Sequence, residues 1–175
     1  MTNWGSSDAT EHVPALRRYA RSLALDPVAA DDLVQQALLL AYESRASFKP
    51  GSSLRAWLFA ILHNQFISGR RRAGVEQRAL SEIARRNEEA VESGAEHAAL
   101  LRETADRFAA LPEGQRSALH LVAIEGLSYQ EAAATLNVAV GTIMSRLSRA
   151  RATLREAADR VTHNRLHIVG GKDVS

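Results

Sequence analysis

The segment 128–154 constrains the fold more than any other part of the chain. It opens with Ser128-Tyr129-Gln130-Glu131, which fits a capping box, where a serine and a glutamate three residues later satisfy each other's free backbone N–H groups. Asn137 follows this first helical pattern, and asparagine tolerates the left-handed conformation of a tight turn. A second apolar stripe then has the spacing of a longer helix and consists of Ile143, Leu147, Ala150 and Leu154. A short helix, a tight turn and a longer helix predict a helix-turn-helix unit.

Three more helices are predicted in the N-terminal half. The first runs from about residue 8 to 24, with an apolar stripe formed by Val13, Leu16, Ala20 and Leu23. Asp26-Pro27 is typical of an N-cap followed by proline in the first turn of a second helix. The buried face of that helix is predicted to contain Ala30, Leu33, Val34, Ala37, Leu38 and Ala41. Pro50-Gly51 interrupts the pattern, and Ser53 can cap a third helix that ends at about Arg70.

The middle of the chain differs in composition from both ends. From Ala73 to about Ala99 apolar residues are sparse and Glu and Arg alternate irregularly, which predicts a linker that is partly helical at best. Helical pattern resumes near Leu100, and Pro112 begins a helix that ends at Gly126 and packs Leu119, Val122 and Ala123 inward. We therefore expect an all-α chain of two small helical domains joined by a flexible linker. The expected boundaries are 8–76 for the first domain, 77–99 for the linker, 100–162 for the second domain and 163–175 for a C-terminal tail.

Composition excludes several classes of function. The sequence has no cysteine, so disulfides, cysteine-ligated zinc, iron–sulfur clusters and thiol catalysis are all excluded. HExxH-like or paired-carboxylate spacing is absent around His63, His97, His120, His163 and His167. We expect no enzyme activity, no cofactor and no metal site. The N-terminus lacks a signal-peptide pattern and no stretch approaches the ~20 apolar residues of a membrane span, so a soluble cytoplasmic protein without membrane insertion is expected.

The second helix of the helix-turn-helix unit has the residue types of a DNA reader. Such a helix lies in the major groove with its N-terminal residues towards the base edges. With the apolar stripe turned inward, the predicted exposed arc contains Thr142, Ser145, Arg146, Ser148 and Arg149. Serine and threonine reach phosphate or base, and the guanidinium group pairs with guanine through two hydrogen bonds. The alternative is the solvated face of an ordinary surface helix.

Two motif blocks resemble one known family. GLSYQEAAATLNVAVGTIMSRLSRARATLRE, preceded by ALPEGQRSALHLVAIE, is similar to region 4 of the extracytoplasmic-function sigma factors of the sigma-70 family, which binds the −35 promoter element. ADDLVQQALLLAYE resembles the region 2 helix that docks on the clamp of RNA polymerase. FKPGSSLRAWLFAILHNQFISGRRR resembles the segments that open and read the −10 element. The resemblance implies a promoter-specific initiation factor whose partners are core RNA polymerase and promoter DNA.

The resemblance also assigns roles to residues in the first block. It implies −10 contacts by the loop residues Phe48, Lys49, Gly51 and Ser52, by Asn64, which matches the position lining the base pocket, and by Arg70 and Arg71. A flipped base is held by edge hydrogen bonds and stacking, which a ring, a cation and an amide can supply. The alternatives are a locally satisfied amide at residue 64 and favourable positive charge at a helix C-terminus for the arginines.

Polymerase docking is implied for an acidic and amide surface formed by Asp31, Asp32, Gln35 and Gln36. Acidic residues in the first turn of a helix also compensate the helix dipole, so this pattern alone does not require a partner.

Within the family, FKPGSSLRAWLFAILHN and LPEGQRSALHLVAIEGLSYQEAA most resemble the general-stress-response branch, called EcfG-like. That branch implies control by an anti-sigma factor. Met144 departs from the family pattern, because many relatives have lysine or arginine at this position. The resemblance therefore does not predict which −35 sequence this chain binds. The alternative function is a free-standing helix-turn-helix regulator that binds operator DNA.

Overall fold

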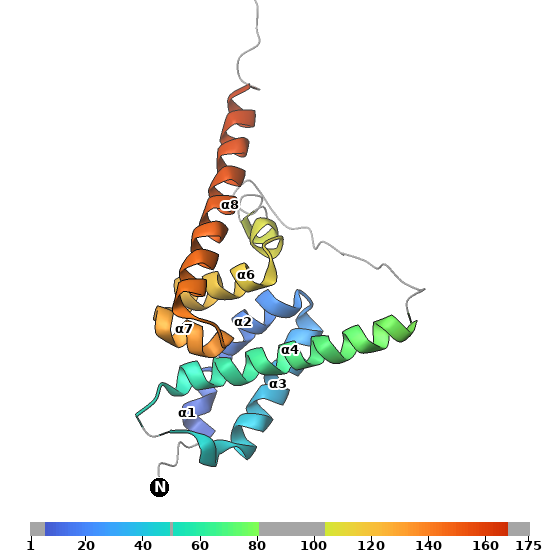
Figure 1. Cartoon of the computed structure of the whole chain (residues 1–175), viewed down its shortest axis with the longest axis vertical. Coiled ribbons are helices and arrows are strands. Elements are labelled where there is room, and N and C mark those ends of the chain that lie inside the picture. Colours follow the sequence, from blue (N-terminus) through green and yellow to red (C-terminus); the bar gives the residue numbers. More distant parts are fainter. Residues whose placement is uncertain (1–5, 50, 81–103, 168–175) are drawn as a thin grey trace, which may run out of the picture.

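The computed structural model describes residues 6–49, 51–80 and 104–167, with side-chain positions described over 8–49, 51–73 and 104–156. Every element in these ranges is helical (Figure 1), which confirms the all-α prediction. The first part of the chain forms α1 (Ser6–Thr10), α2 (Val13–Ala24), α3 (Pro27–Glu43), the short 3₁₀ helix η1 (Arg45–Ser47) and α4 (Leu54–Leu80). The second part forms α6 (Glu113–Leu119), the π turn η2 (His120–Ile124), α7 (Tyr129–Leu136) and α8 (Val140–His167), preceded by helical residues at 104–109.

The first domain is built from α2, α3 and α4, which pack against one another. The Asp26 carboxylate accepts a hydrogen bond from the backbone N–H of Ala29 at 2.7 Å, which confirms the predicted cap of α3. The ring of Tyr19 from α2 meets the edge of Phe59 from α4, with centroids 5.4 Å apart. The predicted apolar faces are buried, except that Val13 and Leu38 are half-buried.

Two helix boundaries in this domain differ from the prediction. The single helix predicted over 8–24 is divided between α1 and α2, because Pro14 lacks a backbone N–H and favours the first turn of a new helix. The third helix does not end near Arg70: α4 continues to Leu80, through residues that are mostly good helix formers. Arg70 and Arg71 therefore lie inside a helix, so the helix-dipole explanation for their charge does not apply. The rest of the predicted linker, residues 81–99, lies outside the described residues.

The second domain contains the predicted helix-turn-helix. Ser128 and Glu131 form both hydrogen bonds of the capping box at the start of α7, and Asn137 ends that helix in the left-handed conformation with φ of 50°. Ile143 and Leu147 of α8 are buried as predicted. Ala123 is exposed, contrary to prediction, because the π turn η2 changes the phase of the helix after α6. The helix α8 extends to His167, into the predicted tail, and residues 168–175 lie outside the described part of the chain.

The two domains are in contact. Helix α7 packs beside α4, and α2 packs beside α6, so the N-terminal domain lies directly against the helix-turn-helix domain (Figure 1). Within the described ranges, no helix has the length and apolar character needed to cross a membrane.

Candidate nucleic-acid interface

The N-terminal half of α8 presents most of the predicted DNA-reading residues to solvent. Ser145, Ser148 and Arg149 are exposed, and Thr142 is half-buried. The Ser145 hydroxyl donates to the backbone oxygen of Thr142 at 3.0 Å, so its oxygen still has lone pairs facing outward. The buried side of the same helix holds Ile143 and Leu147 against the domain core, which fixes the direction of the polar side.

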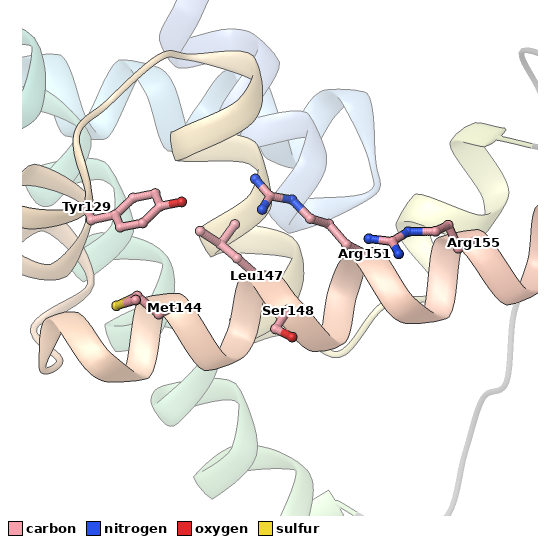
Figure 2. A pocket seen from close by; sticks show the side chains of 6 residues that line it. All are labelled: Tyr129, Met144, Leu147, Ser148, Arg151 and Arg155. Carbon is pink, nitrogen blue, oxygen red and sulfur yellow. The ribbon is translucent and has the colours of Figure 1, made fainter.

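A shallow hollow of about 260 Å³ lies between α7 and α8, beside these residues. Figure 2 shows its lining, which consists of Tyr129, Met144, Leu147, Ser148, Arg151 and Arg155. Tyr129 and Met144 expose large apolar side chains next to two guanidinium groups. This combination fits a nucleic acid, whose phosphates attract arginine and whose thymine methyl groups accept apolar contacts.

The sequence prediction missed Tyr129, Arg151 and Arg155 as members of this surface. A signal was present, because Met144, Ser148, Arg151 and Arg155 repeat at spacings of four, three and four, which is a second stripe on α8. That stripe lies beside the buried one and is continuous with the predicted reading residues.

Arg146 does not share this exposed surface. Its guanidinium carbon lies 3.0 Å from the position that a Cβ on Gly114 of α6 would occupy, so the side chain is folded against the other side of the domain. There it lines a cleft of about 510 Å³ between the two domains, together with Asn64 and Arg71 of α4. Grouping Arg146 with Ser145 and Arg149 on one arc was therefore wrong for this arrangement of the chain.

Of the four predicted −10 contact residues in the loop before α4, one is half-buried and three are exposed. The ring of Phe48 packs edge-on against Trp57, with centroids 5.4 Å apart. Lys49, Gly51 and Ser52 are exposed, and Gly51 has a φ of +81°, a conformation that glycine adopts without steric cost. This turn holds the exposed cation beside an aromatic pair.

On α4, Asn64 is exposed and lines the interdomain cleft, so it is not the locally buried amide of the alternative explanation. Arg71 is also exposed and faces the same cleft. Arg70 is engaged differently, because its guanidinium forms an ion pair with Glu113 of α6.

The outer face of α3 carries the predicted docking residues. Asp32, Gln35 and Gln36 are exposed, whereas Asp31 pairs with Arg17 of α2 at 3.3 Å. The sequence prediction missed three large apolar side chains on the same side, namely Val28, Leu39 and Tyr42, which are 57–70% exposed. Spacings of four, three, four and three connect residues 28, 32, 35, 39 and 42, and this pattern was readable from the sequence. Exposed apolar side chains gathered on one face are typical of protein-binding surfaces.

A buried polar cluster joins the two domains. The Glu125 carboxylate, which is 0% exposed, accepts hydrogen bonds from Arg18 at 3.0 and 3.1 Å and from Arg55 at 2.6 Å. Burial alone would raise the pKa of Glu125, but the hydrogen bonds from Arg18 and Arg55 hold it below its usual value. Glu125 is therefore an anion that two arginines of the other domain neutralise.

Four more buried residues surround this cluster. His120 lies 3.1 Å from Glu125, and burial lowers its pKa despite that carboxylate. The Tyr19 hydroxyl lies 3.0 Å from Nδ1 of His63, and burial lowers the pKa of His63 to about 4. The guanidinium of Arg116 donates to the backbone oxygen of Ser22 at 2.6 Å. The sequence prediction missed the whole cluster, because nothing local distinguishes a carboxylate that pairs across domains from an exposed one. Within the described residues, no group of histidines and carboxylates could hold a metal ion.

Comparisons with known proteins agree with this two-part organisation. Residues 9–63 match the model of the Sigma2 domain of PhyR, and residues 101–154 match the model of Sigma-70, region 4. The sigma factor EcfG of Rhodopseudomonas palustris is 43% identical over 88% of this chain and 84% of its own length. CnrH of Cupriavidus metallidurans is 31% identical over 85% of this chain and 83% of its own.

Solved structures give the same result. The sigma factor RpoE in complex with the anti-sigma factor NepR, from Bartonella quintana, has a TM-score of 0.74 and 37% identity, covering 87% of this chain and 95% of that one. CnrH in complex with the cytosolic domain of CnrY has a TM-score of 0.63 and 31% identity, covering 88% and 86%. These matches confirm the family expected from the sequence, with an EcfG protein among the relatives. The chain belongs to the extracytoplasmic-function sigma factors of the sigma-70 family, which are transcription initiation factors without enzymatic activity of their own.

Proposed function

We propose that this chain binds core RNA polymerase in the cytoplasm and directs it to a set of stress-response promoters, with a defined division of work between its two domains. The observation that carries the proposal is the exposed surface of α8, where Ser145, Ser148 and Arg149 adjoin Tyr129 and Arg151. Hydroxyl, guanidinium and aromatic groups on the second helix of a helix-turn-helix are suited to the −35 duplex. Met144 then offers an apolar contact to a thymine methyl group in place of a cationic contact.

The first domain is proposed to open and read the −10 element. Lys49 and Ser52 are exposed beside the Phe48–Trp57 pair, and Asn64 presents an amide on α4. An unstacked base needs an aromatic or apolar surface and hydrogen bonds to its edge, and these groups can supply both. Arg71 adds positive charge for the backbone of the opened strand.

Polymerase docking is proposed for the outer face of α3. Asp32, Gln35 and Gln36 give it polar and acidic character, and Leu39 and Tyr42 add apolar area towards the C-terminal end of the helix. Exposed apolar side chains gathered beside polar ones on one face are typical of a protein-binding surface. Asp31, paired with Arg17, lies at its edge.

Control by an anti-sigma factor is part of the proposal. It is supported by the two solved relatives, since RpoE was determined with the anti-sigma factor NepR and CnrH with the cytosolic domain of CnrY. The 43% identity to an EcfG protein supports the assignment to stress-response genes.

Transcription from a promoter library with purified core polymerase tests the proposal. The wild-type chain should bind core enzyme and initiate at a subset of promoters. Phe48→Ala and Asn64→Ala should reduce promoter opening, measured by permanganate reactivity of unpaired thymines, without reducing affinity for core enzyme. Gln65→Ala is the matched control, because Gln65 is an amide at the next position of α4 and is turned about 100° away.

Two outcomes would contradict the proposal. Equal loss of core binding and promoter opening in both variants would mean that Phe48 and Asn64 are structural residues. A chain that neither binds core enzyme nor supports initiation, yet binds duplex DNA specifically by itself, would be the free-standing regulator instead.

A further inference from the structure

We propose that Arg18, Arg55 and Glu125 form an interdomain clasp that holds the chain in a closed, autoinhibited form, in which promoter-binding residues of both domains face one narrow cleft. The closed state follows from the contacts between the two domains. Its inhibitory consequence rests on the proposed function of the two domains.

The clasp concentrates three hydrogen bonds on one carboxylate. Arg18 comes from α2 and donates through Nε and Nη2, and Arg55 comes from α4 and donates through Nη2. Both helices belong to the first domain, whereas Glu125 follows η2 in the second. Bonds between a guanidinium and a carboxylate are among the stronger hydrogen bonds in proteins, and a two-pronged pair such as that of Arg18 also fixes orientation. One residue of the second domain therefore fixes two helices of the first.

Other polar contacts cross the same interface, where buried apolar side chains of both domains also pack into one cluster. Arg116 donates to the backbone oxygen of Ser22, and Arg70 pairs with Glu113. The Thr135 hydroxyl lies 3.4 Å from the backbone oxygen of Ala56, as a long hydrogen bond. Each of these polar groups can form hydrogen bonds with water when the domains separate.

The energetics of the clasp suit a switch. Glu125 loses all of its hydration in the closed form, while Arg18 and Arg55 keep 54% and 36% of their side-chain exposure. The desolvation cost of a buried carboxylate offsets much of its attraction to the arginines, so the complete pair adds little net stability. Separating the domains returns all three groups to water. Removing the arginines alone leaves Glu125 buried without compensation, which strongly disfavours the closed form.

Closure also brings some of the promoter-binding residues of the two domains to opposite sides of one cleft. Asn64 and Arg71 of the first domain and Arg146 of the second line the same cleft of about 510 Å³, and Arg70 is occupied by Glu113. A cleft of that volume has the size of a small-molecule site, so it admits neither a duplex nor a separated strand with its bases. Asn64 and Arg71 keep solvent exposure, but the facing domain occupies the space that DNA bound on this side of α4 would need.

The distance between the two promoter elements leads to the same conclusion. The −10 and −35 elements lie about 25 base pairs apart, which is roughly 85 Å of duplex at 3.4 Å per base pair. Helices α4 and α7 are packed side by side in the closed form. Simultaneous binding to both elements therefore requires the domains to separate.

Energy transfer between two dyes on the full-length chain tests closure without DNA or polymerase. The chain has no cysteine, so Glu43→Cys on α3 and Ala152→Cys on α8, both at exposed positions, give specific labels. Adding Arg18→Ala with Arg55→Ala should lower the closed population more than tenfold, because Glu125 would be buried without its partners. The efficiency of energy transfer between the two dyes should fall accordingly. Arg17→Ala with Arg21→Ala is the matched control, because it removes the same two positive charges from exposed positions of α2 and leaves both arginines that donate to Glu125 in place, so transfer should stay at the parent value.

Glu125→Gln is the complementary variant, and it should also lower transfer. If that variant loses helix content by circular dichroism, the double arginine variant decides the question, because it leaves His120 and Glu125 in place. Unchanged transfer in a helical Arg18→Ala, Arg55→Ala chain would overturn the clasp.

The inhibitory role needs a second readout, which is the rate at which the chain, added to core polymerase, forms a complex with promoter DNA. The double arginine variant should form that complex faster than the wild-type chain, because its domains no longer have to separate before both promoter elements are bound. Lower transfer with an unchanged rate of complex formation would overturn autoinhibition and leave the clasp as a purely structural contact. A wild-type chain that shows high transfer but never binds core polymerase would contradict the proposed function and not the clasp.

Discussion

His63 should make the folded chain sensitive to mild acid. Its imidazole is buried between the domains, 3.0 Å from the Tyr19 hydroxyl, and its surroundings include the carboxylate of Glu113 and the guanidinium of Arg146. Burial lowers its pKa from an ordinary 6.5 to about 4, the nearby Glu113 opposing that shift and Arg146 adding to it. The imidazole is therefore neutral in the folded state throughout the range where an unfolded chain becomes protonated.

The sign and size of the effect follow from the two pKa values. Below pH 6.5 the unfolded state binds a proton that the folded state does not. The free energy of unfolding therefore decreases as the pH is lowered, until the folded imidazole also titrates near pH 4. Between pH 7 and pH 5 this one group should remove about 2 kcal/mol from the free energy of unfolding. The pKa of His120 is also lowered, which adds a loss of the same sign.

Urea denaturation at pH 7, 6 and 5, followed by circular dichroism, measures this loss. His63→Gln keeps a hydrogen-bonding group near Tyr19 but cannot titrate, so its loss between pH 7 and 5 should be smaller than that of the wild-type chain by about 2 kcal/mol. The control is His12→Gln, at a half-exposed position before α2, which should follow the wild-type curve. Parallel curves for His63→Gln and the wild-type chain would refute the argument.

Two further predictions concern the helix-turn-helix. Ser128→Ala removes the hydroxyl that caps α7 and should lower the free energy of unfolding by about 1 kcal/mol, whereas Gln130→Ala, exposed in the same turn, should change it little. Equal effects of the two would contradict a capping role. Arg149→Ala should weaken holoenzyme binding to the −35 duplex and reduce the slope of log affinity against log salt by about 0.9 if the arginine contacts a phosphate. Thr153→Ala, one turn further along α8, is its control, and unchanged affinity in Arg149→Ala would exclude the residue from the interface.

Features set by local chemistry were predictable from the sequence. The cap at Asp26, the capping box at Ser128 and the left-handed turn at Asn137 each depend on residues within four positions of one another. The buried stripe of α8 follows from helical spacing in the same way. The family resemblance rested on these same segments, and the comparisons confirm it.

Features set by distant contacts were not predictable in this way. The direction of Arg146 depends on where Gly114 leaves room, and the role of Glu125 depends on partners 70 and 107 residues away. The length of α4 was underestimated because its polar C-terminal part lacks an apolar stripe, although its residues favour helix. The individual roles of the DNA-facing and polymerase-facing residues stay predictions.

The π turn η2 determines which side chain reaches the first domain. The backbone N–H of Glu125 donates to the oxygen of His120, five residues earlier, so this turn contains one residue more than an α-helical turn. Each residue of a helix advances the side chain by about 100°, so a chain with one residue fewer in 120–124 would point its carboxylate in a different direction. The composition and net charge of the chain would hardly change, yet the Glu125 carboxylate would no longer contact Arg18 and Arg55. Communication between the two halves of this molecule thus depends on the length of a single turn, and an insertion or deletion there would uncouple them while leaving the helix-turn-helix sequence intact.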